Sequence, residues 1–155
     1  MKPSVQRVRD ALAAANLHPE IVEYAETTKT AQAAADALGT TVERIVKSLV
    51  FLADDEPLIV LASGVNRVDT VKLGRALGKR IDRADAARVR AATGFAIGGV
   101  APVGYPAWVE TLIDRDLLQY DVVWAAAGTP HHVFPIAPAD LVRVSGGHVA
   151  DVRVE

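Results

Sequence analysis

Two features of the sequence could do chemistry together: a lysine within an apolar segment, and a glycine-rich loop further along the chain. Lys47 is the single charged residue of segment 45–51, and the loop 98–104 is uncharged and holds three glycines and a proline. A partly desolvated ammonium can bind a phosphate or polarise a carbonyl group. Glycines let backbone N–H groups approach one oxygen closely, as stabilisation of an oxyanion requires. The pair therefore suits an anionic or polarised substrate, without a metal or a strong side-chain nucleophile.

Each feature also has a structural interpretation that the sequence alone leaves open. Lys47 ends a short predicted helix, where the helix dipole favours a cation and the side chain can reach water. The glycine-rich loop could be an ordinary turn. It is not a nucleotide-binding loop, because neither GxGxxG nor GxxxxGK[ST] is present.

The remaining polar residues offer little for other chemistries. His131 and His132 are adjacent, so on a strand they would point to opposite faces and could not easily share a metal ion. No serine lies in a nucleophile-elbow motif, and the chain has no cysteine for thiolate or disulfide chemistry. We therefore expect no metal and no cofactor. Tyr24 and Thr30 could line a pocket, but could equally be packing residues.

The composition is that of one ordinary folded domain covering residues 1–155. Half of the residues are hydrophobic and 23% are charged, which permits a proper core. The N-terminus lacks the apolar stretch of a signal peptide, and no apolar run is long enough to span a membrane. The absence of cysteine fits a reducing compartment. We expect a cytoplasmic protein with no membrane partner.

Charge is unevenly distributed along the chain. The formal net charge is −2 and the pI is about 6.1, which argues against a protein that binds nucleic acid over its whole surface. Between Arg67 and Arg90, however, eight basic residues stand against three acidic ones. This stretch could mark a phosphate-contacting face, or it could be the solvated surface of two ordinary helices.

Hydrophobic periodicity and capping residues predict short helices interleaved with strands. Thr30, Asp69 and Asp85 are placed to cap helices, and a turn at 54–57 separates two apolar strands. The pattern favours an α/β (α+β) fold: a single compact domain with a mixed six- to seven-stranded, β-barrel-like sheet and surrounding helices. Helices are expected over 4–17, 31–38, 42–47, 70–77, 86–93 and 138–144, and strands over 20–25, 48–53, 58–63, 111–113, 121–127, 132–136 and 148–152.

Several stretches of the chain together resemble one family. Gly98 and Pro102 match a Gly-x-x-x-Pro loop pattern that follows a lysine earlier in the chain. With this combination the chain resembles the YbaK and prolyl-tRNA synthetase editing-domain family of aminoacyl-tRNA deacylases, and the similarity covers nearly the whole sequence. The strongest matching stretches are the helix end at 38–39, the segment 46–49 with the hairpin after it, the region 93–104, and residues 140–141.

The resemblance implies a metal-free hydrolase and assigns roles to the two features above. Members hydrolyse the ester between a wrong amino acid and the terminal ribose of a tRNA, usually proline tRNA. Lys47 would hold the acceptor end by a phosphate or ribose contact, and the N–H groups of residues 98–101 would bind the aminoacyl carbonyl. A hydroxyl of the tRNA's own terminal ribose would activate the attacking water. The catalytic residues implied in this way are Lys47, Gly98, Gly99, Val100, Ala101 and Pro102.

Departures from the family pattern bear on specificity. Ser48 stands where alanine editors often have asparagine and cysteine editors threonine, and Thr30 stands where bacterial cysteine deacylases tend to have an aromatic residue. Ala126 replaces a frequent serine or histidine, and Val133 falls near an aspartate of some cysteine deacylases. We expect a less polar, roomier pocket that accepts another small amino acid, such as serine or threonine. The expected pocket residues are Tyr24, Thr30, Ser48, Ala126 and Gly128.

The resemblance also implies the partners of the protein. We expect a free-standing editing enzyme acting on aminoacyl-tRNA, with proline tRNA as the expected tRNA, prolyl-tRNA synthetase as a possible partner, and a monomeric or weakly homo-oligomeric state. Two alternatives stay open: a non-catalytic module that binds the acceptor end of a tRNA, and a small acyl-ester hydrolase. The candidate tRNA contacts within the basic stretch are Arg67, Lys72, Arg75 and Lys79.

Overall fold

Short helices alternate with strands in the structure, a computed structural model that describes residues 2–24 and 30–155. The helices are α1 (Pro3–Ala14), α2 (Ala31–Leu38), α3 (Thr70–Leu77), α4 (Ala86–Thr93) and α5 (Pro138–Ser145), with 3₁₀ turns η1 (Val42–Arg44) and η2 (Arg115–Gln119). The strands are β1 (Val22–Glu23), β2 (Val46–Ala53), β3 (Glu56–Ser63), β4 (Ile81–Arg83), β5 (Glu110–Asp114), β6 (Val123–Ala126), β7 (His132–Ile136) and β8 (His148–Ala150).

Side-chain caps fix where three of the helices begin. The Thr30 hydroxyl accepts a hydrogen bond from the Ala33 N–H (3.0 Å), and Asp69 and Asp85 accept equivalent bonds at the starts of α3 and α4. A glycine with positive φ ends each of these helices. These predicted caps are therefore confirmed. Within the described part of the chain, no helix combines the length and the apolar character needed to cross a membrane.

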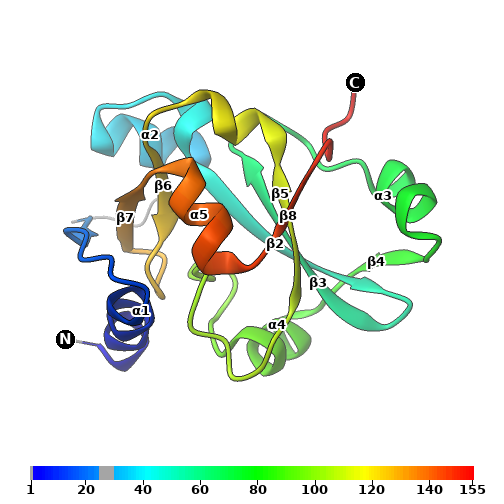
Figure 1. Ribbon diagram of the computed structural model, residues 1–155, viewed down its shortest axis with the longest axis horizontal. Coiled ribbons are helices and arrows are strands. Elements are labelled where there is room, and N and C mark those ends of the chain that lie inside the picture. The colour runs from blue at the N-terminus through cyan, green and yellow to red at the C-terminus, as the bar shows by residue number, and fades with distance from the viewer. Residues whose placement is uncertain (1, 25–29) are drawn as a thin grey trace.

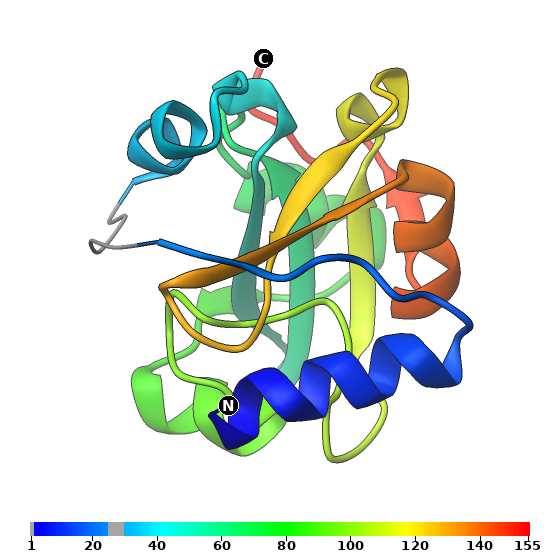
Figure 2. The same ribbon diagram turned by 90° about the vertical axis from the view of Figure 1, so that its left-hand side faces the viewer.

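The described strands form two sheets. A five-stranded sheet has the order β4-β2-β3-β5-β8, and a three-stranded sheet has the order β1-β7-β6. In the larger sheet β2 and β3 form an antiparallel hairpin, whereas β3, β5 and β8 run parallel. Figure 2 shows β6 and β7 lying across the larger sheet beside β2. The predicted mixed α/β class is confirmed, but the described strands are divided between two sheets and do not close into one barrel.

The two faces of the β2–β3 hairpin pack against different helices, because side chains alternate along each strand. Ile59 and Leu61 join a core cluster with α1, α4 and α5, whereas Leu58 and Val60 join a cluster with α3. All four side chains are fully buried. Figure 1 shows α3 set apart from α1, α4 and α5 accordingly. The hairpin is thus a rigid central support for any functional residue on β2.

The structure differs from the prediction around Lys47. The predicted helix over 42–47 is a single 3₁₀ turn, Val42–Arg44, and Ile45 is already extended (φ −88°, ψ 125°). Pairing with β3 begins at Val46, and this pairing overrides a short helical pattern. Lys47 therefore lies inside β2 and not at a helix C-terminus.

Three further local features differ from what the sequence predicted. Asp54 and Asp55 alone connect the hairpin, both with positive φ (47° and 69°), so Pro57 lies within β3 and not in the turn. The short elements β4 and η2 were not predicted, since so few residues carry little periodicity. The predicted strand over 20–25 is reduced to β1, and its last residue, Ala25, lies outside the described residues.

The outer edge of β2 is open between two neighbouring strands. Trp124 of β6 forms a bridge with Ile45, and β4 pairs with β2 only over Phe51–Ala53. The Val50 C=O accepts a hydrogen bond from the residue after β4 (3.3 Å) on this edge. Because backbone groups alternate in direction along a strand, the N–H and C=O of Ser48 point to the same edge. Among the described residues, this stretch of β2 therefore has no strand neighbour on its outer edge.

Candidate active site

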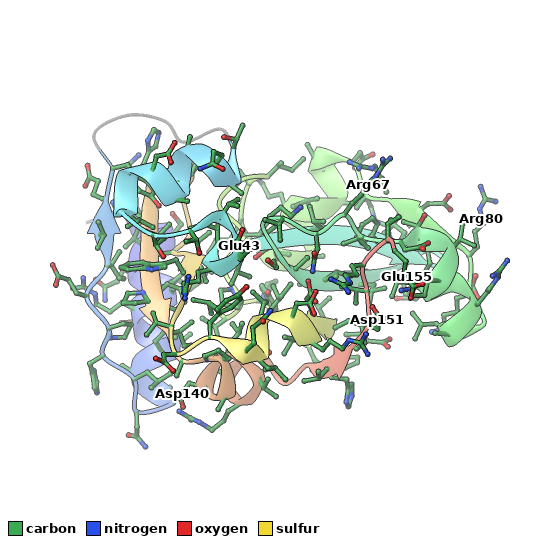
Figure 3. All side chains as sticks on the ribbon, turned by 90° about the horizontal axis from the view of Figure 1, so that it is seen from above. Glu43, Arg67, Arg80, Asp140, Asp151 and Glu155 are labelled. Atoms are coloured by element: carbon green, nitrogen blue, oxygen red, sulfur yellow. The ribbon has the colours of Figure 1, made fainter. Side chains whose placement is uncertain are left out.

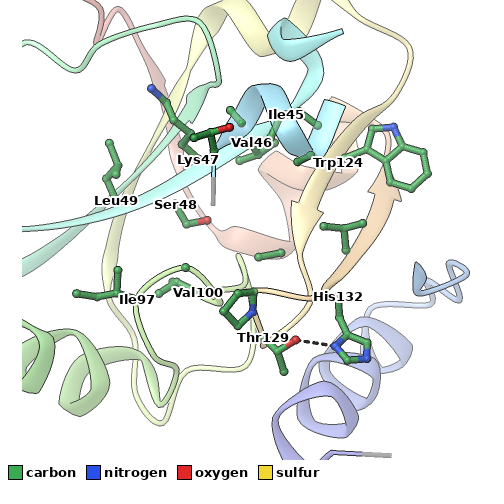
Figure 4. A pocket seen from close by; sticks show the side chains of 17 residues that line it. Ile45, Val46, Lys47, Ser48, Leu49, Ile97, Val100, Trp124, Thr129 and His132 are labelled. Atoms are coloured by element: carbon green, nitrogen blue, oxygen red, sulfur yellow. Dashed lines mark hydrogen bonds between the residues drawn. The ribbon is translucent and has the colours of Figure 1, made fainter. Parts of the chain in front are cut away.

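A cavity of about 300 Å³ lies over this open edge of β2 (Figure 4). Residues of β2, β6, β7 and α2 form its walls, together with the glycine-rich loop and the turn between β6 and β7. Its lining is mostly apolar, and the few polar side chains come from β2, β6, β7, the start of α2 and the β6–β7 turn. The lining residues are Thr30, Ala31, Ala34, Ile45, Val46, Lys47, Ser48, Leu49, Ile97, Gly98, Val100, Trp124, Ala126, Thr129, Pro130, His132 and Val133.

The glycine-rich loop is held from behind by packed side chains. The Tyr105 hydroxyl donates to the Ala101 carbonyl (2.6 Å), and burial raises the pKa of this phenol. Just before the loop, the Phe95 N–H donates to Thr93 Oγ1 (3.1 Å), and the Arg7 guanidinium lies over the Phe95 ring, 4.4 Å from its centroid. These contacts preorganise the loop, as an oxyanion site requires.

Two glycines set how closely the loop approaches the opposite turn. Gly98 has φ +89°, which other residues rarely adopt, and a Cβ there would lie 3.5 Å from Pro130. A Cβ on Gly99 would lie 2.8 Å from Thr129 Cα, so no side chain fits. The Gly99 N–H already donates to the Ala96 carbonyl, just before the loop (3.0 Å). Gly98 and Val100, which line the cavity, are therefore the loop residues whose N–H groups could meet a substrate.

Lys47 is a partly desolvated cation at the cavity wall. Its Nζ donates to the backbone carbonyl of Asn66, and Figure 4 shows the ammonium pointing away from the glycine-rich loop. Burial lowers the pKa of Lys47, and the nearby Asp114 carboxylate opposes that shift. An ammonium has three N–H donors. One is used by Asn66, so two remain for a bound molecule.

Asn66 links Lys47 to two carboxylates. Its Nδ2 donates to Asp114 (2.7 Å) and to Asp116 (2.8 Å), and Asp114 also accepts the Ser63 N–H (3.0 Å). Asp114 is 1% exposed and Asn66 is 8% exposed, so this network is buried. It fixes the carbonyl that holds Lys47. Sequence reasoning missed it, although Asn66 follows β3 and Asp114 ends β5, and a predicted parallel pairing of these strands would have brought the two residues together.

Ser48 presents an unused hydroxyl to the cavity. Its Oγ is buried and has no hydrogen-bond partner among the described residues. Figure 4 shows this oxygen directed inward, on the opposite side of β2 from the Lys47 ammonium. A buried hydroxyl without a partner is costly unless a ligand or water supplies one. Ser48 therefore offers polar recognition within an otherwise apolar wall.

His132 holds the turn between β6 and β7. Its Nδ1 lies 2.6 Å from Thr129 Oγ1, and its Nε2 lies 3.2 Å from the Glu23 carboxylate. A carboxylate can only accept, so Nε2 is the donor toward Glu23, and Nδ1 shares a hydrogen bond with the Thr129 hydroxyl. The Thr129 oxygen in turn accepts the His131 N–H (3.1 Å). Within the described part of the chain, no three histidine or carboxylate side chains gather where a metal ion could sit.

The expected pocket residues are only partly brought together. Thr30, Ser48 and Ala126 line the cavity. Tyr24 does not: it packs in the core beside α2, where burial raises its pKa to about 12. Gly128 does not line the cavity either. Its φ is +97°, and a Cβ there would collide with the first turn of α1.

The implied catalytic loop residues fall into two groups. Gly98 and Val100 line the cavity. Gly99, Ala101 and Pro102 are buried behind them. The first group can touch a substrate, and the second group shapes the loop.

The four candidate tRNA contacts lie outside the cavity lining. Lys72 is half-buried, and its ammonium contacts the Asp151 carboxylate (3.2 Å) and the Arg153 backbone carbonyl (2.7 Å). The contact with Lys72 lowers the pKa of Asp151. It therefore anchors the C-terminal segment to α3. Arg67, Arg75 and Lys79 are exposed, and Figure 3 shows Arg67 toward the α3 end of the molecule.

The fold is a mixed α/β domain, and its cavity combines apolar walls, a few polar side chains and the glycine-rich loop. Comparison with known families makes this assignment specific. The model of the aminoacyl-tRNA editing domain matches residues 25–144, most of the chain, and the chain belongs to that family. The resemblance seen in the sequence is thereby confirmed, together with the expected class of activity, hydrolysis of aminoacyl-tRNA.

Individual relatives agree with this membership. A solved structure described as a candidate trans-editing enzyme for prolyl-tRNA synthetase is 42% identical, with a TM-score of 0.95, covering 100% of this chain and 99% of that one. EbsC of Enterococcus faecalis, described as a candidate Cys-tRNA(Pro)/Cys-tRNA(Cys) deacylase, is 26% identical over 134 residues, 85% of this chain and 82% of EbsC. The proline–tRNA ligase of Lactobacillus helveticus is 35% identical over 97 residues, 61% of this chain but 17% of the ligase.

Proposed function

We propose that this protein is a trans-editing deacylase that removes a small non-cognate amino acid from proline tRNA. The observation that carries the proposal is one cavity lined by the braced glycine-rich loop, the Ser48 hydroxyl and Lys47, whose ammonium is held at Asn66 on the other side of β2. Support for proline tRNA comes from the full-length similarity to a protein described as a candidate trans-editing enzyme for prolyl-tRNA synthetase, and from the match to one part of a proline–tRNA ligase.

In the proposed reaction the aminoacyl group enters the cavity with its carbonyl oxygen against the N–H groups of Gly98 and Val100. Water attacks the carbonyl carbon, and the loop stabilises the negative charge that develops on the oxygen. The ester C–O bond then breaks, releasing the free amino acid and a terminal ribose hydroxyl. The neighbouring ribose hydroxyl accepts a proton from the attacking water and passes its own proton to the departing ester oxygen, so both ribose hydroxyls are neutral at the end. Orientation and electrostatics are enough for such an activated ester.

Lys47 has a separate role in this proposal. Its two remaining donors contact a phosphate or ribose oxygen of the acceptor end, outside the apolar part of the cavity. Its carbonyl partner on Asn66 holds the ammonium in place. The cation thereby fixes the ester at the mouth of the cavity.

Small, mostly apolar walls set the proposed specificity. Ala126 and Val133 both line the cavity, and neither brings a polar side-chain group to it. Ser48 supplies one hydroxyl that has no hydrogen-bond partner among the described residues. The cavity therefore suits a small side chain, with serine or threonine able to use the Ser48 oxygen.

The proposal is tested with proline tRNA charged separately with alanine, cysteine, serine, threonine and proline. We expect hydrolysis of at least one mischarged species and sparing of the proline form. Tight, salt-sensitive tRNA binding without turnover of any species would instead indicate a non-catalytic acceptor-end module. Equal turnover of a free aminoacyl ester lacking tRNA would indicate a small acyl-ester hydrolase.

A further inference from the structure

A second, smaller hollow continues the cavity along the open edge of β2. Its volume is about 110 Å³, and it shares Ser48, Leu49, Ile97 and Val100 with the cavity. Arg83, the last residue of β4, lies in its lining. We call this hollow the β2 groove. It leads from the cavity to the point where β4 begins to pair with β2.

Sheet geometry places two cations on one side of this groove. Arg83 is directly opposite Phe51, and opposite residues of an antiparallel pair project from the same face. Alternation along β2 puts Lys47 and Leu49 on that face as well, so Lys47 and Arg83 flank Leu49 and lie about 13 Å apart along the strand. Arg83 is exposed, and no described residue pairs with its guanidinium.

The middle of the groove is apolar. Leu49 is half-buried, and Ile97 is 61% exposed on the loop facing it. Val89 and Val100 lie beneath, almost fully buried. Figure 4 shows Leu49 and Ile97 on the same side of the site as the Lys47 ammonium. An apolar slot between two cations is complementary to a flat base joined to phosphates.

We propose that the β2 groove binds the terminal nucleoside of the acylated RNA, with the base between Leu49 and Ile97 and its phosphate at Arg83. This inference rests on the proposed function. The ester joins the amino acid directly to the terminal ribose, so the nucleoside must begin at the mouth of the cavity. The groove shares four lining residues with the cavity, and it is therefore the continuous path for the rest of that nucleotide.

A hollow on the other side of the site is the main competing path. It is lined by Lys2, Arg9 and His131 among others, and it shares only His132 with the described lining of the cavity. The Glu23 carboxylate also lines it and would repel a phosphate. Both its weaker connection and this charge favour the β2 groove.

The test uses the unacylated RNA trinucleotide CCA as the probe, titrated into the whole isotope-labelled protein and followed by amide NMR shifts at several salt concentrations. Arg83→Ala should raise the Kd about fivefold and lower the slope of log K against log salt by about 0.7, the effect of one lost phosphate contact. Arg80→Ala is the matched control, because Arg80 is 81% exposed beside β4 and pairs with Asp82 (3.0 Å). It should change neither quantity. Ile97→Ser should weaken binding with the salt slope unchanged.

Several results would overturn the proposal. One is the same Kd and salt slope for the Arg83 and Arg80 variants. Another is that the amide shifts fall at Lys2, Arg9 and His131 in place of Leu49 and Ile97. The third is that no amide of the groove shifts at all. The test is independent of turnover. Binding of CCA in the groove by a protein that hydrolyses no charged tRNA would leave the site standing and remove the proposed function. Normal hydrolysis of charged tRNA, with a KM that Arg83→Ala leaves unchanged, would keep the proposed function and remove the β2 groove as the nucleoside site.

Discussion

At the scale of single residues, the site depends on how a cation is kept charged while partly buried. Burial lowers the pKa of Lys47, and Asp114 opposes this shift. If protonated Lys47 is needed, deacylation falls as the pH rises through this lowered pKa. Asp114→Asn removes the opposing charge, so the Lys47 pKa drops further and the fall in kcat/KM begins at lower pH. The measurement is the alkaline limb of the pH–rate profile, corrected for uncatalysed hydrolysis.

Asp116→Asn is the matched control for this change. Asp116 accepts from the same Asn66 amide as Asp114, but it is not among the groups that shift the Lys47 pKa. Its alkaline limb should match that of the unaltered protein. Identical profiles for the Asp114 and Asp116 variants would show that Asp114 is structural only.

The residue scale is also where sequence reasoning was most and least successful. Lys47 and the loop containing Gly98 were singled out from residue type and local context, and Ser48 from the family resemblance, and all of them contribute to the lining of one cavity. Asn66 and Asp114 were missed, because their contact depends on the parallel register of β3 and β5. Local periodicity does not encode that register, which is set by long-range packing.

At the scale of elements, the glycine-rich loop acts as a unit fitted against the β6–β7 turn. Gly99→Ala would place a Cβ 2.8 Å from backbone of that turn, and something must shift. We expect a loss of about 2–4 kcal/mol in the free energy of unfolding, together with a large loss of deacylation. Urea unfolding and single-turnover hydrolysis measure the two effects.

Gly98→Ala and Gly78→Ala calibrate this result. A Cβ on Gly98 (φ +89°) would meet Pro130 at ordinary contact distance, and a Cβ on Gly78 (φ +65°) would meet nothing. Each substitution should therefore lower the free energy of unfolding mainly through backbone strain, by about 1–2 kcal/mol. Gly99→Ala with no greater loss of stability than Gly78→Ala would contradict the fitted-loop account.

The elements themselves were largely predictable. Capping by Thr30, Asp69 and Asp85, the β2–β3 hairpin and helix α5 follow from local chemistry, and the structure has them. The helix predicted through Lys47 was wrong, since strand pairing outweighed a short helical pattern. The division of the strands into two sheets is likewise a property of pairing and not of any single segment.

At the scale of the whole molecule, the basic residues of α3 differ in role: one holds the C-terminal segment and another faces solvent. Lys72 anchors the C-terminal segment through Asp151, whereas Arg75 projects from the same helix into solvent. Lys72→Ala should lower the Tm, and Arg75→Ala should leave the Tm unchanged. If α3 contacts tRNA, Arg75→Ala should also reduce the salt slope of tRNA binding by about 0.9. A lowered Tm for both variants, or for neither, would contradict this division.

The most direct test of the account is single-turnover deacylation of mischarged proline tRNA by the unaltered protein, Lys47→Ala and Lys47→Arg. The account predicts that Lys47→Ala folds normally and loses about 100-fold in rate, and that Lys47→Arg retains part of the activity because it keeps the charge. Hydrolysis by Lys47→Ala at the rate of the unaltered protein would contradict the central claim, that the cation on β2 and the braced loop act together on a tRNA-bound ester.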